Sequence, residues 1–115
     1  PFSRADLLGC LVGVFLGVDK CDWQFVRPES TLSSVYAMTS AANSIAAGRL
    51  SFAISLQGPC VTFDTACSSA LVATHSSTRA LQLCECEYAI AEGVNLNLSP
   101  TTHAGLTRAQ QHGYA

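Results

Sequence analysis

The amino-acid sequence predicts an α/β fold, and three observations support this prediction. A short aliphatic run at residues 11–17 has the length of a buried strand. Residues 60–64 and 88–99 alternate between apolar and polar positions, which is the periodicity of strands. Segments of helical composition lie between these runs, at residues 34–50 and after residue 67. Strands that alternate with helices are typical of a parallel sheet covered by helices.

The first half of the chain is expected to contain one strand, one loop and one helix. The strand "LVGVFLG" at residues 11–17 is short, aliphatic and bounded by glycines. Residues 21–34 are polar and contain Pro28, so we expect a loop there. Residues 34–50 carry Ala, Ile and Met and are expected to form a helix that ends near Gly48, a residue suited to a C-terminal cap.

The second half is expected to contain two further strands around a second helix. Residues 51–59 are predicted to give a short extended piece and a turn at Gly58, before the strand of residues 60–64. The helix then begins near Cys67. The last strand has two chemically different faces, with Val94, Leu96 and Leu98 on one and Asn95, Asn97 and Ser99 on the other.

The helix that follows Cys67 carries a stripe of small side chains. These residues recur at steps of three and four: Ala66, Ala70, Ala73, Ser77 and Ala80. Such a stripe lets a helix approach its neighbour closely, and few polar positions remain on the other sides. We therefore expect a helix that is buried on most sides, in the middle of a layered structure.

The composition indicates that much of the outer face packs against something else. Charged residues make up 12% of the chain and hydrophobic residues 49%, whereas soluble domains typically carry about 25% charged residues. A small domain has a large surface that normally needs charge. The sequence also begins at Pro1 rather than at a methionine. We therefore expect the 115 residues to be part of a larger folded unit.

Charge and hydropathy argue against two classes of partner. The net charge is −2 and there is no basic run, so nucleic acid is not an expected partner. No apolar stretch approaches the about 20 residues that a membrane-spanning helix needs. Residues 7–18 are too short, are interrupted by glycines, and lack the flanks of a signal peptide.

Six cysteines raise the question of disulfides or a metal: Cys10, Cys21, Cys60, Cys67, Cys84 and Cys86. The aliphatic content allows a proper core, so we expect reduced thiols and a cytoplasmic setting rather than a secreted disulfide scaffold. Zinc sites usually space their cysteines by about two to four residues and need a second pair. Neither the "CEC" of residues 84–86 nor the histidines His75, His103 and His112 complete such a pattern, so we expect buried or half-buried thiols and no metal.

Cys67 lies at the junction between a strand and a helix, in "DTACSS". The thiolate is the reactive form of cysteine, and the N-terminus of a helix stabilises negative charge through its unpaired N–H groups and its macrodipole. The same donors can stabilise an oxyanion when a thiolate attacks a carbonyl carbon. Ala66, Ser68 and Ser69 are small enough to leave room for a substrate. The local pattern favours a nucleophile, as at the serine elbow of hydrolases, over a buried structural cysteine.

The motif "GPCVTFDTACSSALVATH" at residues 58–75 resembles the active-site signature of the β-ketoacyl synthase family, the condensing enzymes with a thiolase fold. The ketosynthase domains of modular polyketide synthases are especially similar around "DTACSS". The resemblance extends through "VGVFLG", "SAANSIAAGRLSF" and "AIAEGVNLNLSP", and so covers nearly the whole chain in order. It implies a thiolase-like αβαβα layered fold, of which residues 1–115 are the N-terminal portion, a partial domain that contains the nucleophile.

The resemblance also implies an acyltransferase chemistry. Cys67 would accept an acyl group from the phosphopantetheine arm of an acyl carrier protein, and its backbone N–H would contribute to the oxyanion hole. Decarboxylation of a malonyl-type thioester would then give the carbanion equivalent that attacks the Cys67 thioester. No cofactor would be bound. The two histidines that assist this step in the family lie in motifs beyond this sequence, so residues 1–115 alone are predicted to be inactive.

The resemblance leaves three other readings of function open. They are a fatty-acid 3-oxoacyl-[acyl-carrier-protein] synthase, a non-condensing or scaffold domain that retains the cysteine, and a thiol hydrolase. The strand of residues 60–64 commonly lies at a two-fold interface in the family, so we also expect a homodimer.

Five other residues bear on this resemblance. His75 lies eight residues after Cys67, about 12 Å along a helix, and is not expected to act with it. His103 and His112 belong to no family histidine motif. Glu92 stands where the family usually has a small residue, and it needs a partner or solvent. Arg49 matches a family position and is expected to pair with a carboxylate or with carbonyl groups.

Overall fold

The computed structural model describes residues 4–22, 42–98, 100, 104–105 and 107–108. The chain divides into two compact units. The first unit comprises Pro1–Asp19 and Ala42–Val94, and it contains Cys67 and most of the sheet. The second comprises Lys20–Ala41 and Asn95–Ala115. Within the second unit the buried carboxylate of Asp22 accepts a hydrogen bond from the Leu98 N–H at 3.3 Å.

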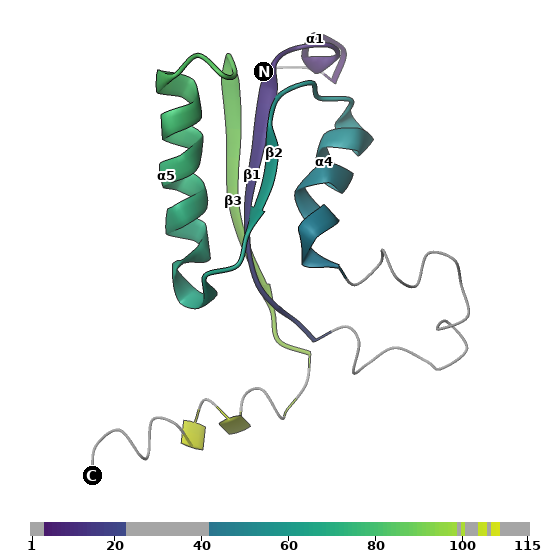
Figure 1. Ribbon diagram of the computed structural model, residues 1–115. Coiled ribbons are helices and arrows are strands. Elements are labelled where there is room, and N and C mark those ends of the chain that lie inside the picture. Colours follow the sequence, from purple (N-terminus) through teal and green to yellow (C-terminus); the bar gives the residue numbers. More distant parts are fainter. Residues whose placement is uncertain (1–3, 23–41, 99, 101–103, 106, 109–115) are drawn as a thin grey trace. The chain divides into compact units, whose positions relative to one another are not determined.

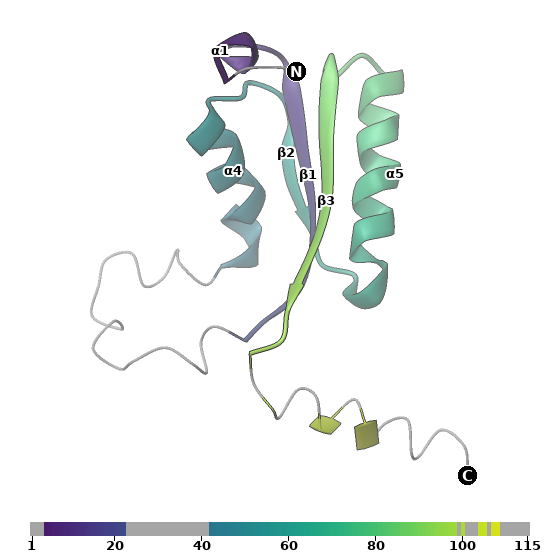
Figure 2. The same ribbon diagram turned by 180° about the vertical axis from the view of Figure 1, so that it is seen from behind.

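Strands and helices alternate along the described chain. The elements are α1 (Arg4–Leu7), β1 (Val12–Cys21), the 3-10 helix η2 (Asn43–Ile45), α4 (Ala46–Ile54), β2 (Cys60–Phe63), the 3-10 helix η3 (Ala66–Ser68), α5 (Ser69–Gln82) and β3 (Tyr88–Leu96). The three strands form one sheet in the order β2-β1-β3. Helices α4 and α5 lie on opposite faces of this sheet (Figures 1 and 2). The predicted α/β class is therefore confirmed.

The three strands run in the same direction. Strand β1 pairs with β2 in parallel, with Val14 opposite Cys60 and Gly17 opposite Phe63. The start of β3 lies beside the start of β1, because the Glu87 N–H donates to the Leu11 carbonyl at 2.8 Å. Figure 1 shows β1 and β3 side by side with the same direction. The connection from β2 to β3 passes through α5 and crosses β1, as parallel strands require a crossover.

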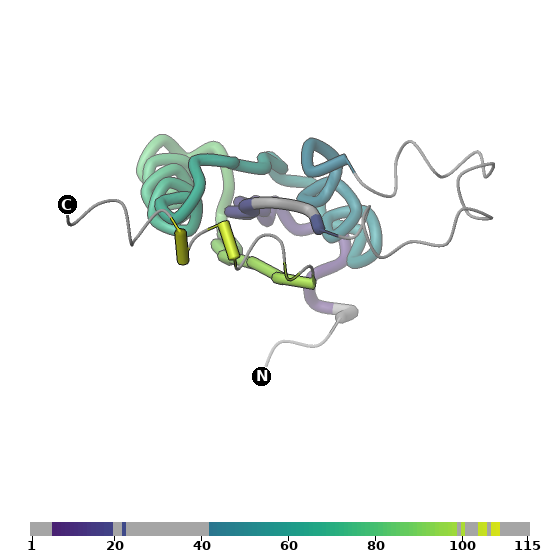
Figure 3. The backbone as a smooth tube through the Cα atoms, turned by 90° about the horizontal axis from the view of Figure 1, so that it is seen from below, coloured from purple at the N-terminus to yellow at the C-terminus, as the bar shows by residue number. Residues whose placement is uncertain are grey.

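The core lies on both faces of the sheet, with β1 as the central strand (Figure 3). Alternate residues of a strand point to opposite faces. The cluster on the α4 side contains Val12, Val14, Leu16, Ala47 and Leu56. The cluster on the α5 side contains Phe15, Ala73, Ala80 and Cys86. Burial on both faces explains why this strand is a continuous aliphatic run, and it confirms the buried strand predicted from residues 11–17.

Hydrogen bonds fasten the start of α4 to the sheet. The Ala47 N–H donates to the Thr62 hydroxyl of β2 at 3.1 Å, and the Asn43 side-chain amide donates to the Asp19 carbonyl of β1 at 3.0 Å. Helix α4 therefore rests on both strands. The parts of the predicted loop and helix that fall at residues 23–41 lie outside the described residues.

The predicted end of α4 near Gly48 is wrong. The helix continues through Gly48 to Ile54 and ends on Ser55, which adopts the left-handed conformation with φ 62°. The Leu56 N–H donates to the Ser51 carbonyl at 2.9 Å, which is the closing bond of a Schellman motif. Leu56 is buried in the core, so burial of this leucine determines where the helix ends. The extended piece predicted for residues 51–59 is correspondingly helical up to Ile54.

Helix α5 ends with the same motif. Cys84 occupies the left-handed position with φ 56°. The Glu85 N–H donates to the Ala80 carbonyl at 2.9 Å, and the Cys84 N–H donates to the Leu81 carbonyl at 3.2 Å. Both long helices thus end on a residue that is not glycine, although glycine is the usual choice there.

Only one side of α5 is buried, contrary to expectation. Of the small-residue stripe, Ala73, Ser77 and Ala80 are buried, whereas Ala66 and Ala70 are exposed. On the opposite side Leu71 is 73% exposed, because no described element covers that face. The predicted strand β3 is confirmed, although its apolar residues are also exposed, including Val94 and Leu96.

Large apolar side chains are exposed on both helices in the described part of the chain. Phe52 of α4 is 88% exposed, and Leu71 and Leu81 of α5 are exposed as well. None of the described helices has the length and apolar character needed to cross a bilayer.

Candidate active site

The candidate nucleophile Cys67 lies in η3, between the end of β2 and the start of α5. This is the carboxyl-terminal edge of the parallel sheet, where open α/β sheets generally bind ligands. Figure 1 shows β2 leading into the start of α5 at this edge. Cys67 is exposed and carries a free thiol. The location predicted from the sequence, at a strand-to-helix junction, is confirmed.

A sharp backbone turn precedes Cys67. Ala66 adopts the left-handed conformation with φ 54°. This conformation costs a residue with a Cβ atom about 1–2 kcal/mol, so neighbouring groups must hold it. Backbone strain of this kind is often found at functional sites.

The Ser69 hydroxyl supplies two of the interactions that hold this turn. It accepts a hydrogen bond from the Thr65 N–H at 2.8 Å and donates one to the Ala66 carbonyl at 2.7 Å. Ser69 itself is buried, with 4% of its surface exposed. One fixed hydroxyl group therefore binds the backbone on both sides of the strained Ala66 residue.

Ser68 adds a further interaction on the exposed side of the turn. Its hydroxyl donates to the Thr65 carbonyl at 2.7 Å and lies 2.9 Å from the Thr65 hydroxyl. The sequence indicated only that Ser68 and Ser69 are small. The signal for their structural role was the grouping of Thr and Ser just before a helix, since short hydroxyl side chains commonly bond to nearby backbone at helix starts.

The backbone N–H of Cys67 lies just before the first hydrogen bonds of the helix. The first helical hydrogen bond runs from the Ser68 N–H to the Thr65 carbonyl at 3.3 Å, and the Ser69 N–H bonds to the Ala66 carbonyl. The Cys67 N–H precedes both bonds, and N–H groups at this point have no acceptor within their helix. An exposed thiol next to such a donor can attack a carbonyl carbon, and the N–H can then stabilise the oxyanion that forms.

Within the described part of the chain, His75 does not join Cys67 in a common site. His75 is exposed and lies further along α5, within its second turn. His103 and His112 lie outside the described residues. Glu92 of β3 is exposed, so its carboxylate is in contact with solvent, as expected for a charged group without a buried partner.

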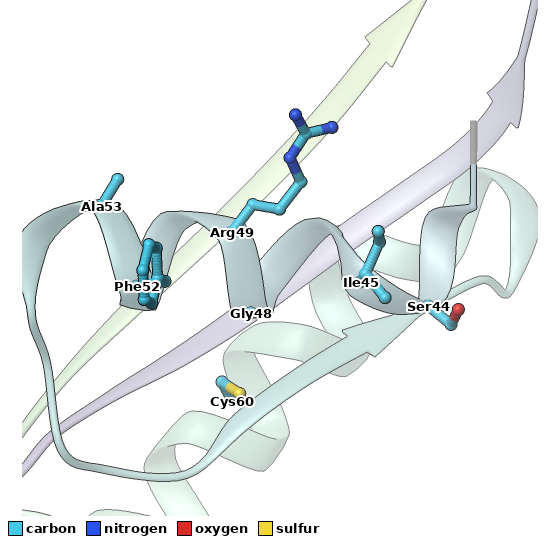
Figure 4. Close-up of a pocket in the computed structure, with 7 residues that line it drawn as sticks. All are labelled: Ser44, Ile45, Gly48, Arg49, Phe52, Ala53 and Cys60. Atoms are coloured by element: carbon cyan, nitrogen blue, oxygen red, sulfur yellow. The ribbon is translucent and has the colours of Figure 1, made fainter. Parts of the chain in front are cut away.

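A separate hollow of about 550 Å³ lies beside the start of β2, away from Cys67 (Figure 4). It is lined by Ser44, Ile45, Gly48, Arg49, Phe52, Ala53 and Cys60. The Arg49 side chain extends away from Cys60 in Figure 4. The pairing predicted for Arg49 is not found, since within the described part of the chain no group binds its guanidinium and the residue is exposed.

The remaining cysteines are dispersed. Five described cysteines carry free thiols: Cys10, Cys60, Cys67, Cys84 and Cys86. Of the "CEC" pair, Cys86 is buried as expected, whereas Cys84 is exposed because it lies in the turn after α5. Residues 4–22 and 42–98 bring together no group of three or more His, Cys, Asp or Glu side chains that could hold a metal ion.

The chain is similar in sequence to one protein family and to several known proteins. Residues 2–113 match the family described as "Beta-ketoacyl synthase, N-terminal domain". The chain is 42% identical over 100 residues to polyketide synthase ThaG of Burkholderia thailandensis, covering 86% of this chain and 2% of that protein. It is 46% identical over 95 residues to tenellin synthetase of Beauveria bassiana, covering 82% of this chain and 2% of that protein.

A solved structure shows the same fold. The ketosynthase from module 6 of the bacillaene synthase of Bacillus subtilis 168 superimposes with a TM-score of 0.75 at 30% identity, covering 94% of this chain and 17% of that one. The chain thus spans a small part of each of these proteins. Because the family match covers residues 2–113 of the 115, the chain belongs to the β-ketoacyl synthase N-terminal domain family.

Proposed function

We propose that this chain is the nucleophile-bearing part of a polyketide ketosynthase, an acyltransferase that joins acyl and malonyl-type thioesters by decarboxylative Claisen condensation. One observation supports this most directly. In a chain of the β-ketoacyl synthase family, Cys67 is exposed at the carboxyl edge of a parallel sheet, at the start of α5. The similarity to polyketide synthase ThaG and to the ketosynthase of the bacillaene synthase favours the polyketide reading.

The first half-reaction transfers the acyl group to Cys67. The Cys67 thiolate attacks the carbonyl carbon of an acyl thioester carried on the phosphopantetheine arm of an acyl carrier protein. The Cys67 N–H donates to the oxyanion that develops on the carbonyl oxygen. The tetrahedral intermediate collapses, the carbon–sulfur bond to the arm breaks, and the arm leaves as a thiolate, which takes up a proton in place of the one that Cys67 lost on ionisation.

The second half-reaction lengthens the acyl chain. Loss of carbon dioxide from a malonyl-type thioester leaves an enolate, whose carbon attacks the carbonyl carbon of the Cys67 thioester. A carbon–carbon bond forms and Cys67 departs as a thiolate, which restores the starting state. We assign the decarboxylation step to groups outside these 115 residues, and we therefore expect the isolated chain to give no condensation product by mass spectrometry.

We further propose a homodimer in which the outer edge of β2 contributes to the contact. Strand β2 lies at one side of the sheet order, and its residues Cys60 and Val61 are exposed. An uncovered strand edge is a template for pairing with another chain, and a two-fold axis would pair it with its own copy. Light scattering of the full-length protein should give the mass of a dimer, and a monomer would contradict this proposal.

The experiment that tests the function uses the full-length protein and a radiolabelled acyl thioester. The wild-type protein should retain one label on the peptide that contains Cys67, and Cys67→Ala should retain none. Cys84→Ala is the matched control, because it removes an exposed thiol elsewhere in the chain, and it should be labelled like the wild type. Label retained by Cys67→Ala would remove this residue from the mechanism.

The products formed by the labelled full-length protein distinguish condensation from the alternative functions. A condensing enzyme should yield a product longer by two carbons when a malonyl-type thioester is added. A scaffold or non-condensing domain would accept the label without extending it, and a thiol hydrolase would release the free acid. A fatty-acid synthase would extend and accept fully reduced acyl chains in repeated cycles.

A further inference from the structure

Two glycines on adjacent strands lie under the first turn of α5. Gly17 of β1 is buried, and a Cβ atom at this position would lie 2.5 Å from the Ser69 carbonyl carbon and 2.6 Å from the Ala70 nitrogen. Real Cβ atoms essentially never approach other atoms below 3.0 Å. The backbone of the first helical turn therefore rests directly on the backbone of β1.

Gly93 of β3 makes the corresponding contact with a side chain. A Cβ atom at position 93 would lie 2.5 Å from the Ala70 Cβ and 3.4 Å from the Ala70 Cα. The close neighbour here is a single methyl group, whereas at Gly17 the close neighbours are backbone atoms. Glycine inside a strand often marks such an approach.

These contacts are mechanically connected to Cys67. Ser69 and Ala70 follow Cys67 by two and three residues, and the Ser69 hydroxyl is bonded to Thr65 and Ala66 on the other side of the cysteine. A shift of the first turn of α5 away from the sheet would therefore move the cysteine elbow with it. Backbone donors must lie close to the oxyanion to be effective.

We infer that Gly17 and Gly93 are positioning residues for the acyl transfer, because they set the depth at which the first turn of α5, and with it Cys67, lies on the sheet. This inference rests on the proposed role of Cys67 as the nucleophile. It assigns no contact with substrate to either glycine, since both act through Ser69 and Ala70.

The test is a rescue experiment in the full-length protein. Gly93→Ala should lower the rate of Cys67 acylation by about 100-fold, which is the loss that a displacement of about 1 Å can cause. Ala70→Gly removes the methyl group that the new Cβ would meet. The double variant Ala70→Gly with Gly93→Ala should therefore return to within about twofold of Ala70→Gly alone, because the cause of the clash is gone.

Gly17→Ala is the matched control, because its new Cβ meets backbone that no side-chain change can remove. Its acylation should remain slow when Ala70→Gly is added. Rates are measured per folded molecule, below the melting temperature of every variant, with the label located on the Cys67 peptide. A loss of stability alone would change the folded fraction but not this rate.

The outcomes separate this inference from the proposed function. Acylation of Gly93→Ala at the wild-type rate would overturn the inference, and so would a double variant as slow as Gly93→Ala. If Gly93→Ala does not fold, the acylation rate of the double variant is compared with that of Ala70→Gly. A double variant much slower than Ala70→Gly would overturn the inference. Labelling that persists in Cys67→Ala would instead overturn the proposed function, whatever the glycine variants do.

Discussion

The two ends of α5 carry two cysteines that look alike but lie in opposite environments. Cys67 precedes the helix and follows the left-handed residue Ala66, whereas Cys84 follows the helix and is itself left-handed. Both thiols are exposed. The first N–H groups and the last carbonyl groups of a helix have no partner in the regular helical pattern, so its start carries positive and its end negative partial charge. Both ends thus carry an exposed thiol at or beside a left-handed residue, and they differ in the direction of the helix dipole.

The two ends also differ in how the turn is held. At the start, the buried Ser69 hydroxyl and the Ser68 hydroxyl bind the backbone of residues 65–66. At the end, backbone hydrogen bonds alone close the turn, from Cys84 and Glu85. The site end therefore depends on particular side chains, and the far end does not.

In the comparison of the two helix ends, the largest effect is expected from removing the Ser69 hydroxyl. Ser69→Ala loses two hydrogen bonds, each worth about 1 kcal/mol, so the free energy of unfolding should fall by about 2 kcal/mol. The acylation rate per folded molecule should fall by about tenfold, because the Ala66 turn is no longer fixed. Chemical denaturation and acyl labelling measure the two effects.

Ser77→Ala is the matched control for that change. Ser77 is also buried on α5, at 6% exposure, but its hydroxyl donates only to the Thr74 carbonyl of its own helix at 2.8 Å. Its removal should leave the acylation rate unchanged and alter stability by less than Ser69→Ala. Equal effects of the two variants on acylation would show that Ser69 acts only through general packing.

A second prediction compares the two thiols directly. Helix ends favour charges of the opposite sign by about 0.3–1 kcal/mol each. Cys67 at the start of α5 should therefore react with iodoacetamide about tenfold faster than Cys84 at its end, because alkylation proceeds through an anionic sulfur. Mass spectrometry of the two peptides at short reaction times gives this ratio in one sample.

High salt provides the check on that ratio. Surface electrostatic effects are screened at high ionic strength, so the difference between Cys67 and Cys84 should shrink in 1 M salt, where the Debye length is about 3 Å. A ratio that does not respond to salt would attribute the difference to access rather than to charge.

The strands, the second helix and the position of Cys67 could be predicted from the sequence, because they follow from the periodicity of apolar residues. Alternation identified β2, and the change to helical spacing placed Cys67 at the junction. The buried central strand followed from an unbroken aliphatic run. These features depend on local pattern, which a single sequence contains.

The features that could not be predicted depend on contacts between distant residues. The prediction that α4 ends near Gly48 relied on the preference for glycine at helix caps. The helix instead ends at Ser55, where the following residue Leu56 is buried. Gly17 was taken as the boundary of a strand, whereas β1 continues to Cys21 and the glycine accommodates the backbone of α5. The left-handed Ala66 gave no signal, since alanine is not a residue that usually adopts this conformation.

The smallest expected effect tests whether the far end of α5 is purely structural. Cys84→Gly should raise the free energy of unfolding by about 1 kcal/mol, because glycine adopts φ 56° without the Cβ penalty. Ser55→Gly, at the same position of α4 with φ 62°, should give a similar gain. Neither substitution should alter the acylation rate, which labelling of the full-length protein measures beside thermal unfolding. A change in the acylation rate with Cys84→Gly would show that the end of α5 also influences Cys67, so that the far end of the helix would not be purely structural.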